Sequence, residues 1–198
     1  MAVTTRDHAV RHPNAHMTKP ITVEEVINSK PIAEPLNILD CCLISDAGGA
    51  YIVTTAERAK DLKSDPVYLH GIGEYHTHEH LMCADSLTEF GALETGRRAY
   101  TMAGLGPEDM DFAELYDCFS VVPMIEMEEL GLCERGGAGA MVEAGDTRID
   151  GRLPVNTHGG MLSHAHAGAA GGLFGIIEAV RQLRGQEGER QVANHDVA

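Results

Sequence analysis

The stretch LPVNTHGGMLSHAHAGAAGGLFG, residues 153–175, places three histidines and several glycines directly before an apolar segment that can form a helix. Glycine lets a backbone approach a ligand closely, and the first turn of a following helix offers free N–H groups to an anion. A histidine held there can move a proton near neutral pH. The stretch therefore predicts either a catalytic turn or a purely structural strand-to-helix turn, and spacing alone favours neither.

The composition bounds the class of protein. With 198 residues, 43% of them hydrophobic and 23% charged, the chain can form one or two compact domains and has no signature of disorder. The sequence has no apolar run near the roughly 18–20 residues that a membrane span needs, and its opening, MAVTTRDHAVRHP, lacks the apolar core of a signal peptide. These features predict a cytoplasmic protein without a membrane span.

Charge and cysteine content narrow the choice of partners. The formal net charge of −15 argues against nucleic acids and anionic membranes, because both are bound through excess Lys and Arg. A small-molecule ligand remains open. The cysteines form no CxxC pair and are odd in number, which in a cytoplasmic chain indicates free thiols; they are Cys41, Cys42, Cys83, Cys118 and Cys133.

Hydrophobic periodicity changes repeatedly along the chain. Helices are predicted where apolar residues recur at helical spacing between capping and stop signals: residues 22–29 with a Thr22/Glu25 capping box, 87–104 stopped by Gly104, and 169–185 stopped by Gly185. Short β-favouring runs predict strands within residues 50–63, 66–76 and 111–132, the first and last leading into helices. Strands that alternate with helices predict an α/β layered domain.

Several ordered blocks resemble the thiolase superfamily. NTHGGMLSHAHAGAAGG (156–172) is similar to the thiolase motif in which Asn, two variable residues, Gly-Gly, a short run and Gly-His-Pro precede a glycine-rich helix start. ELYDCFSVVPMIEMEELGL (114–132) is similar to the block that carries Asn-Glu-Ala-Phe in ordinary thiolases and His-Asp-Cys-Phe in the sterol-carrier-protein type. CERGGAGAMVEAGD (133–146) and the segment from residue 12 to residue 59 also resemble that branch. The chain thus resembles the C-terminal half of a sterol-carrier-protein-type, acetyl-CoA acetyltransferase-like thiolase.

The resemblance implies an α/β fold, namely one half of the condensing-enzyme fold, with a mixed five-stranded sheet and helices on its faces. On this reading residues 1–48 are the linker region and the end of the first half, and residues 49–198 are the C-terminal domain without its final segment. The nucleophilic cysteine of the family lies in the first half. The chain is therefore expected to need an N-terminal half or a partner chain, and to form a homo- or hetero-oligomer.

The resemblance also implies an activity. The expected function is acyl transfer on a coenzyme A thioester, with formation or thiolytic cleavage of a carbon–carbon bond in lipid or steroid side-chain metabolism. Coenzyme A is then part of the substrate, with no covalently bound cofactor and no metal. His166 matches the histidine of Gly-His-Pro, although Ala165 and Ala167 replace its neighbours. An imidazole there can activate the nucleophile or orient the thioester carbonyl.

Tyr116 departs from the thiolase pattern, since it stands where thiolases carry the Asn of Asn-Glu-Ala-Phe. A phenol donates one hydrogen bond or acts as an acid, but it cannot reproduce an amide. Tyrosine at this place resembles the thiolase-like aldolases that cleave steroid side-chain acyl-CoA thioesters, often with a small OB-fold subunit. In that alternative, Tyr116 handles the proton of the substrate hydroxyl.

Further residues of the motif blocks are predicted to contact substrate. They are Asn156, His158, Gly159, Gly160, Ser163 and Cys118. Cys118 is predicted to be a buried structural thiol rather than a substitute nucleophile. His158 and His164 flank the turn, and they are predicted to cap backbone carbonyls rather than to contact the pantetheine arm. Cys41 and Cys42 are predicted to be small apolar side chains in the protein interior, because free cysteine is commonly buried.

Three histidines alternate in EYHTHEHL (74–81): His76, His78 and His80. In an extended segment they lie on one face and can bind a transition metal, but a loop or substrate-channel role is favoured. Two function classes stay open for the whole chain. It is either the catalytic half of a thiolase-like enzyme or a non-catalytic domain that binds acyl-CoA or a partner, and His166 in register with the motif favours the first.

Overall fold

The computed structural model describes the backbone of all 198 residues and every side chain except that of Leu81. Its strands β1 (Pro31–Ala33) and β2 (Leu36–Asn37) form an antiparallel pair. Its α-helices are α1 (Ala2–Arg11), α2 (Val23–Ile27), α3 (Ala56–Ala59), α4 (Ala92–Ala103), α5 (Val122–Glu129), α6 (Ala138–Ala144) and α7 (Gly172–Leu183).

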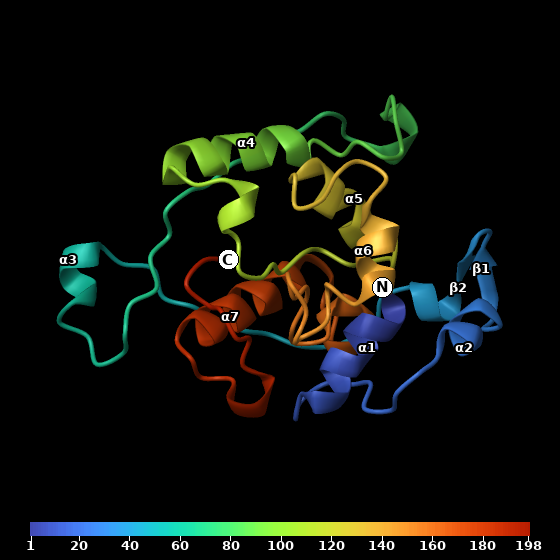
Figure 1. Ribbon diagram of the computed structural model, residues 1–198, viewed down its shortest axis with the longest axis horizontal. Helices are drawn as coiled ribbons and strands as arrows, with labels where there is room; N and C mark the ends of the chain where they lie inside the picture. The colour runs from blue at the N-terminus through green and yellow to red at the C-terminus, as the bar shows by residue number, and fades with distance from the viewer.

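The core lies where the N-terminal helix meets the glycine-rich stretch. Helix α1 packs against the π-helical turn Gly160–His164, next to α7 and beneath α5 and α6 (Figure 1). Met127 of α5 and Val155 are fully buried in one apolar cluster with side chains of α6. Burial of a Val- or Met-sized side chain contributes about 1.5–3 kcal/mol, so this cluster fixes the loops that flank the turn.

The structure confirms the helices predicted within residues 22–29, 87–104 and 169–185, although α4 begins only at Ala92 and α7 at Gly172. Thr22 and Glu25 form the predicted capping box at α2, and α4 ends at Gly104 with a φ of 70°. Helix α7 ends before Gly185, which also has a positive φ. Glycine adopts this left-handed conformation without steric cost, which explains why the predicted stops hold. Helices α1 and α6 were not predicted.

The predicted five-stranded sheet is not found in the described backbone. There, strand pairing consists of β1 with β2 and two isolated bridges, Cys41 to Phe119 and Ala113 to Val155. The strands predicted within residues 50–63, 66–76 and 111–132 are not formed: residues 50–55 and 66–74 have no regular secondary structure, and 111–132 contributes only the two bridges to strand pairing. Apolar side chains of residues 50–55 and 66–74 face solvent, with Ile52 and Leu69 at 90% and 79% exposure. A strand is stable only against a neighbour that completes its hydrogen bonds and covers its apolar face, and neither is present here.

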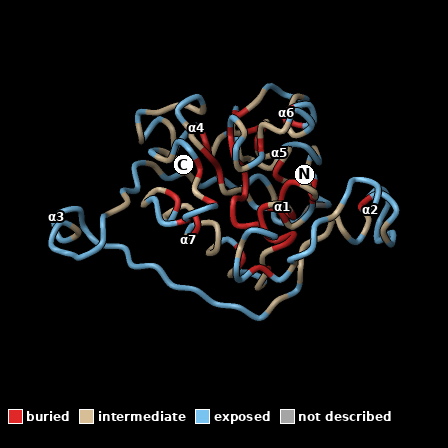
Figure 2. Tube along the Cα trace, turned by 60° about the horizontal axis from the view of Figure 1, so that its bottom comes forward, coloured by how far each residue is buried: buried red, intermediate tan, exposed pale blue. Residues whose placement is uncertain are grey.

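The chain exposes more surface than a compact protein of its size. Its accessible area is 11949 Å², whereas a folded monomer of 21.3 kDa is expected to expose about 9,100 Å². Figure 2 shows where the excess lies: the segment that leads to α3 and the lobe of α2 stand away from the buried centre. Among the helices of the described chain, none is long and apolar enough to cross a membrane.

Candidate active site

The turn that precedes the π-helix is held from within by Asn156. This residue is fully buried and has a φ of 55°, a left-handed conformation that asparagine tolerates better than most residues. Its Oδ1 accepts a hydrogen bond from Leu115 N–H at 2.7 Å, and its own N–H donates to Ala113 O at 2.9 Å. Asn156 therefore joins the glycine-rich turn to the segment that carries Tyr116.

Asp117 forms the second link between these two segments. Its buried carboxyl accepts hydrogen bonds from Met161 N–H at 2.6 Å and Leu162 N–H at 3.4 Å. Burial raises the pKa of Asp117 to about 7, although the two N–H donors act in the opposite direction. The carboxyl also packs against Gly160, where any β-carbon would clash with it. Asp117 thereby fixes the turn directly beside Tyr116.

Gly160→Ala is expected to destabilise the protein more than Gly168→Ala. Both glycines have a similar left-handed φ, 58° and 57°. A β-carbon strains this conformation, so each variant is expected to lose about 1–2 kcal/mol of its free energy of unfolding. Only at Gly160 does the new β-carbon meet a buried carboxyl, whereas Gly168 faces open space. Overpacking adds about 1–3 kcal/mol. Urea unfolding of the complete protein measures the difference, and equal losses in the two variants would refute the proposed packing of Asp117.

His166 lies between two side chains that come from distant parts of the sequence. Its Nε2 is 3.3 Å from Tyr116 Oη, and its Nδ1 is 3.0 Å from Cys42 Sγ. The Tyr116 ring meets the imidazole edge-on, with ring centroids 6.0 Å apart. Tyr116 is 42% exposed, so its hydroxyl can be reached from solvent. The structure thus brings together the two residues that were predicted to be catalytic.

The backbone of His166 is fixed by Ser45. Ser45 N–H donates to His166 O at 2.9 Å, and His166 N–H donates to Ser45 Oγ at 3.2 Å. Cys42 is fixed in the same way, because its N–H donates to Cys118 O at 2.9 Å. The residues 42–45 thus form an extended bridge between the Tyr116 segment and His166. This bridge places the Cys42 thiol, the His166 imidazole and the Tyr116 phenol in one row.

The electrostatic surroundings keep the phenol and the thiols protonated. Burial, followed by Cys118, Cys42 and nearby carboxylates, raises the pKa of Tyr116. Burial and then Cys41 and Asp117 raise the pKa of Cys42. For Cys118, burial together with Cys42 and carboxylates raises the pKa to about 11. Since the thiolate is the nucleophile, these surroundings do not activate Cys118.

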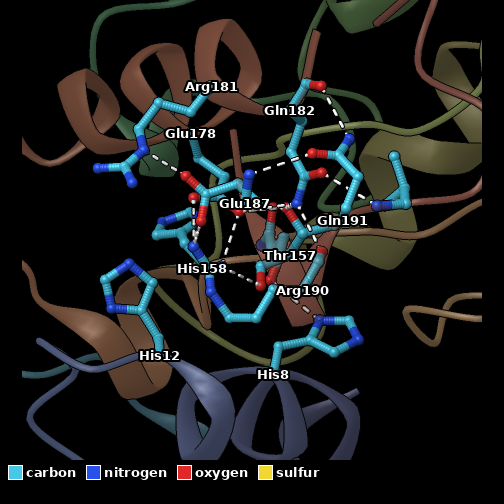
Figure 3. A network of polar contacts seen from close by, with 12 residues as sticks. His8, His12, Thr157, His158, Glu178, Arg181, Gln182, Glu187, Arg190 and Gln191 are labelled. Carbon is cyan, nitrogen blue, oxygen red and sulfur yellow. Dashed lines mark hydrogen bonds and ion pairs between the residues drawn. The ribbon is translucent and has the colours of Figure 1, made fainter. Parts of the chain in front are cut away.

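A polar network supports the other side of the turn (Figure 3). Arg190 pairs with Glu178 of α7 at 2.9 Å and also with Glu187, and all three side chains are nearly fully buried. Arg190 Nη1 also donates to Thr157 O at 3.2 Å. Gln182 Nε2 donates to Glu178 Oε1 at 3.1 Å. The buried face of α7 is therefore its polar one, while its apolar residue Ile176 remains 44% exposed.

Histidines of the turn and of the N-terminal segment fill the space below this network. His158 is buried and its Nδ1 lies 2.8 Å from Glu114 Oε2. Burial lowers the pKa of His158, but Glu114 and the other carboxylates outweigh it, so the net shift is upward. His12 and His164 stack edge to face, and burial lowers their pKa values to about 4 and about 3. Glu114 thus favours the protonated form of His158, whereas burial favours the neutral form of His12 and His164.

The residues predicted to contact substrate are mainly turned inward. Ser163 accepts a hydrogen bond from Arg6 Nε at 2.9 Å, and His158 contacts Glu114 as described. Contact of substrate with this set stays a prediction; the set is Asn156, His158, Gly159, Gly160, Ser163 and Cys118. Of the glycine-rich stretch, Asn156, His158 and Ser163 have their polar atoms turned into the protein, whereas the ring of His166 contacts the exposed Tyr116; a catalytic role of His166 stays a prediction.

The alternating histidines lie apart from this site. His76 Nε2 contacts Glu74 at 3.0 Å and His78 Nδ1 contacts Thr77 at 2.7 Å, both on exposed side chains. His80 approaches Glu79 at 4.0 Å. Within the described part of the chain, no group of three or more His, Cys, Asp and Glu side chains is arranged to hold a metal ion.

Sequence reasoning missed several residues of the site. Cys42 was interpreted as a packing residue, although its thiol contacts His166 across 124 positions of sequence. Asp117 and Glu114 were not singled out, although each binds the turn through its carboxyl. Their place within two residues of Tyr116 was the available signal, because a motif block that positions one side chain also positions its neighbours.

Comparisons with known proteins show the family to which the chain belongs. The family model described as "Thiolase C-terminal domain-like" matches residues 73–198. The chain belongs to the thiolase family. It is 42% identical over 193 residues to the 17-hydroxy-3-oxo-4-pregnene-20-carboxyl-CoA lyase of Mycobacterium tuberculosis, covering 93% of this chain and 49% of the relative. It is 37% identical over 198 residues to the acetyl-CoA acetyltransferase of Methanothermobacter thermautotrophicus, covering 100% and 52%.

Among solved structures, the thiolase-family chain is similar to the Ltp2-ChsH2(DUF35) aldolase. The TM-score is 0.91 at 39% sequence identity, and the match covers 98% of this chain and 51% of that chain. This thiolase-family chain therefore spans about half the length of the relatives it matches. The thiolase-like fold and the relationship to enzymes that act on coenzyme A thioesters are established by these matches.

Proposed function

We propose that this chain carries the proton-transfer residues of a thiolase-like retro-aldolase. The proposed substrate is a β-hydroxyacyl-CoA thioester, and the products are a ketone and a shortened acyl-CoA. The observation that carries the proposal is the contact of 3.3 Å between Tyr116 Oη and His166 Nε2, made by a phenol that is 42% exposed. A tyrosine paired with an imidazole can accept and return a proton, whereas it cannot replace the amide of thiolases.

The proposed step balances without a further reactant. The substrate hydroxyl gives its proton to Tyr116 Oη while the phenol passes its own proton to His166 Nε2, and the hydroxyl oxygen becomes the oxygen of the ketone. The electrons of the carbon–carbon bond pass to the α-carbon as the thioester enolate. That carbon then takes up a proton, so no free coenzyme A is consumed. His166 Nε2 lies within hydrogen-bond reach of Tyr116 Oη to accept the phenol proton, and it releases a proton again as the α-carbon is protonated, so both side chains return to their starting state.

Two relatives favour this chemistry. The Mycobacterium tuberculosis relative is named a lyase for a pregnene that carries a 17-hydroxyl group and a 20-carboxyl-CoA group, which makes the hydroxyl β to the thioester carbonyl. The solved structure with a TM-score of 0.91 is named an aldolase. A steroid or other bulky side-chain thioester is accordingly the substrate class that we propose.

Acyl transfer is the second candidate. It is favoured by the 37% identity to an acetyl-CoA acetyltransferase and by the thiol of Cys42 next to His166, since a thiol beside an imidazole is the usual acyl-accepting pair. The raised pKa of Cys42 argues against this use of the pair. Thiolysis in this candidate needs a cysteine from the first thiolase half.

The exposed apolar surface supports a proposed partner. Residues 50–55 and 66–74 belong to no helix or strand and carry exposed apolar side chains such as Ile52 and Leu69, and the chain exposes roughly 2,800 Å² more than a compact protein of its mass. An obligate interface of 2,000–5,000 Å² is of this order. We propose that an N-terminal thiolase half or a partner chain covers this surface in an oligomer, and that a small OB-fold subunit joins it, because the similar aldolase structure contains two named components.

His166→Ala tests the proposed function. In the complete protein the variant is expected to form ketone from a β-hydroxyacyl-CoA at least tenfold more slowly, since Tyr116 loses its hydrogen-bond partner. His80→Ala is the matched control, because that histidine is exposed and remote from Tyr116. An unchanged rate in His166→Ala would contradict the proposal. Cleavage of a β-ketoacyl-CoA that depends on free coenzyme A would favour acyl transfer, and binding without either reaction would indicate a non-catalytic domain.

A further inference from the structure

Ser45 bonds to both backbone polar groups of His166. His166 N–H donates to Ser45 Oγ at 3.2 Å, and Ser45 N–H donates to His166 O at 2.9 Å. His166 lies between the π-helical turn Gly160–His164 and the 3₁₀ turn Gly168–Ala170 and belongs to neither element. The position of the His166 ring therefore depends on a residue that is 121 positions away in the sequence.

The Ser45 hydroxyl is itself held by the segment that follows α1. Its Oγ lies 3.1 Å from His16 Nδ1, and His16 N–H donates to His164 O at 3.0 Å. A hydroxyl oxygen has two lone pairs and one hydrogen, so after accepting from His166 N–H it can either donate to His16 Nδ1 or accept from it. Both tautomers of His16 therefore allow this contact. Three segments of the chain thus meet at the Ser45 hydroxyl, which has a protein partner on each side.

The contact between Tyr116 and His166 has little tolerance for movement of the imidazole. Tyr116 Oη and His166 Nε2 are 3.3 Å apart, slightly beyond the usual range of about 2.7–3.2 Å for hydrogen bonds between nitrogen and oxygen. Proton transfer needs the two atoms within about that range, and a displacement of about 1 Å can cost a factor of about 100 in rate. A side chain that holds the His166 backbone in place therefore affects the proposed proton transfer.

We propose that Ser45 is a positioning residue whose hydroxyl holds the backbone of His166, so that Nε2 of His166 stays within reach of the Tyr116 phenol. This inference rests on the proposed function, because it concerns the proton transfer between Tyr116 and His166. In this role Ser45 contacts neither the substrate nor the moving proton. It therefore acts on the chemical step rather than on binding of the acyl-CoA.

Kinetics of three variants test this role in the complete protein. Ser45→Ala is expected to lower kcat for β-hydroxyacyl-CoA cleavage about tenfold with KM nearly unchanged, because His166 N–H loses its acceptor. Ser45→Thr is expected to recover most of the lost rate, since threonine keeps the hydroxyl. Ser29→Ala is the matched control, because the Ser29 hydroxyl also accepts a backbone N–H, that of Leu39 at 3.4 Å, in the lobe of α2. Equal kcat values in Ser45→Ala and Ser29→Ala, or a loss in Ser45→Thr as large as in Ser45→Ala, would overturn the proposal.

Amide exchange and urea unfolding separate this inference from the proposed reaction and from a merely structural role. In protein with ¹⁵N-labelled histidine, the His166 amide is expected to exchange with D₂O at least tenfold faster in Ser45→Ala than in the unsubstituted protein, while the urea midpoint stays equal to that of Ser29→Ala. Unchanged exchange at His166, or a urea midpoint well below that of Ser29→Ala, would overturn the inference even if cleavage is found. Faster exchange in a protein that does not cleave β-hydroxyacyl-CoA would contradict the proposed function while confirming that Ser45 holds His166.

Discussion

Tyr116→Phe is expected to lower kcat for cleavage of a β-hydroxyacyl-CoA by about 10²–10⁴-fold, the usual contribution of one general acid–base group. The variant keeps the ring and its edge-on packing against His166 and removes the oxygen that lies 3.3 Å from Nε2. KM is expected to change little, because the removed oxygen acts mainly on the moving proton. Steady-state rates of ketone release from the complete protein measure both constants.

Tyr68→Phe is the control for this substitution. Tyr68 is 50% exposed, similar to the 42% of Tyr116, but its ring contacts His70 rather than His166. It is expected to cleave at the rate of the unsubstituted protein. A Tyr116→Phe protein that cleaves as fast as this control would show that Tyr116 does not handle the hydroxyl proton.

Arg190→Met is expected to destabilise the protein by about 3–5 kcal/mol, the usual cost of removing one partner from a buried ion pair. Arg190 is 6% exposed and neutralises Glu178 and Glu187, each 3% exposed. Without the guanidinium, two buried carboxylates lie close together and Thr157 O loses its donor. Because Thr157 directly precedes His158 in the turn, this loss is expected to loosen the turn as well. Urea unfolding of the complete protein measures the change.

Arg135→Met is the matched control for the buried pair. Arg135 contacts Glu89 at 2.7 Å, a short distance, but the two side chains are 67% and 56% exposed. Water and salt screen such a pair, so its loss is expected to cost about 0–1 kcal/mol. If Arg190→Met costs no more than Arg135→Met, the polar network does not stabilise the turn.

Elements with local signals could be predicted from the sequence. Thr22 and Glu25 cap α2 through contacts three residues apart, and Gly104 ends α4 through its own backbone conformation. These interactions involve neighbours in the chain, so short patterns encode them. Helix α7 was predicted from apolar spacing, but Glu178 and Gln182 form its buried face. Spacing predicts that a helix forms, whereas its partners decide which face is buried.

The five-stranded sheet could not be predicted from local sequence patterns and was expected only from the family resemblance. Strand pairing depends on segments that are remote in sequence, and residues 50–55 and 66–74 have no strand partner among the described residues. Their apolar side chains remain exposed, and the chain covers about half the length of the matched relatives. The family resemblance predicted the thiolase-like fold correctly, whereas the number of strands in its sheet stays a prediction.

The candidate site was predictable only in part. Tyr116 and His166 could be singled out because each lies in a motif block, and the fold brings them to 3.3 Å. The place of Cys42 at the other ring nitrogen depends on the path of residues 42–45 across the molecule, which no local pattern encodes. The turn residues Asn156 and Ser163 follow the motif as well, yet their polar atoms contact the protein itself.

The fate of the substrate hydroxyl tests the central claim most directly. The complete protein would be incubated in D₂O, without free coenzyme A, with a β-hydroxyacyl-CoA whose hydroxyl oxygen is ¹⁸O, and the products would be weighed by mass spectrometry. We predict equal amounts of a ketone that retains ¹⁸O and a shortened acyl-CoA that has gained one deuterium at its α-carbon. Cleavage only after addition of free coenzyme A, with two thioester products from a β-keto substrate, would contradict the retro-aldol account.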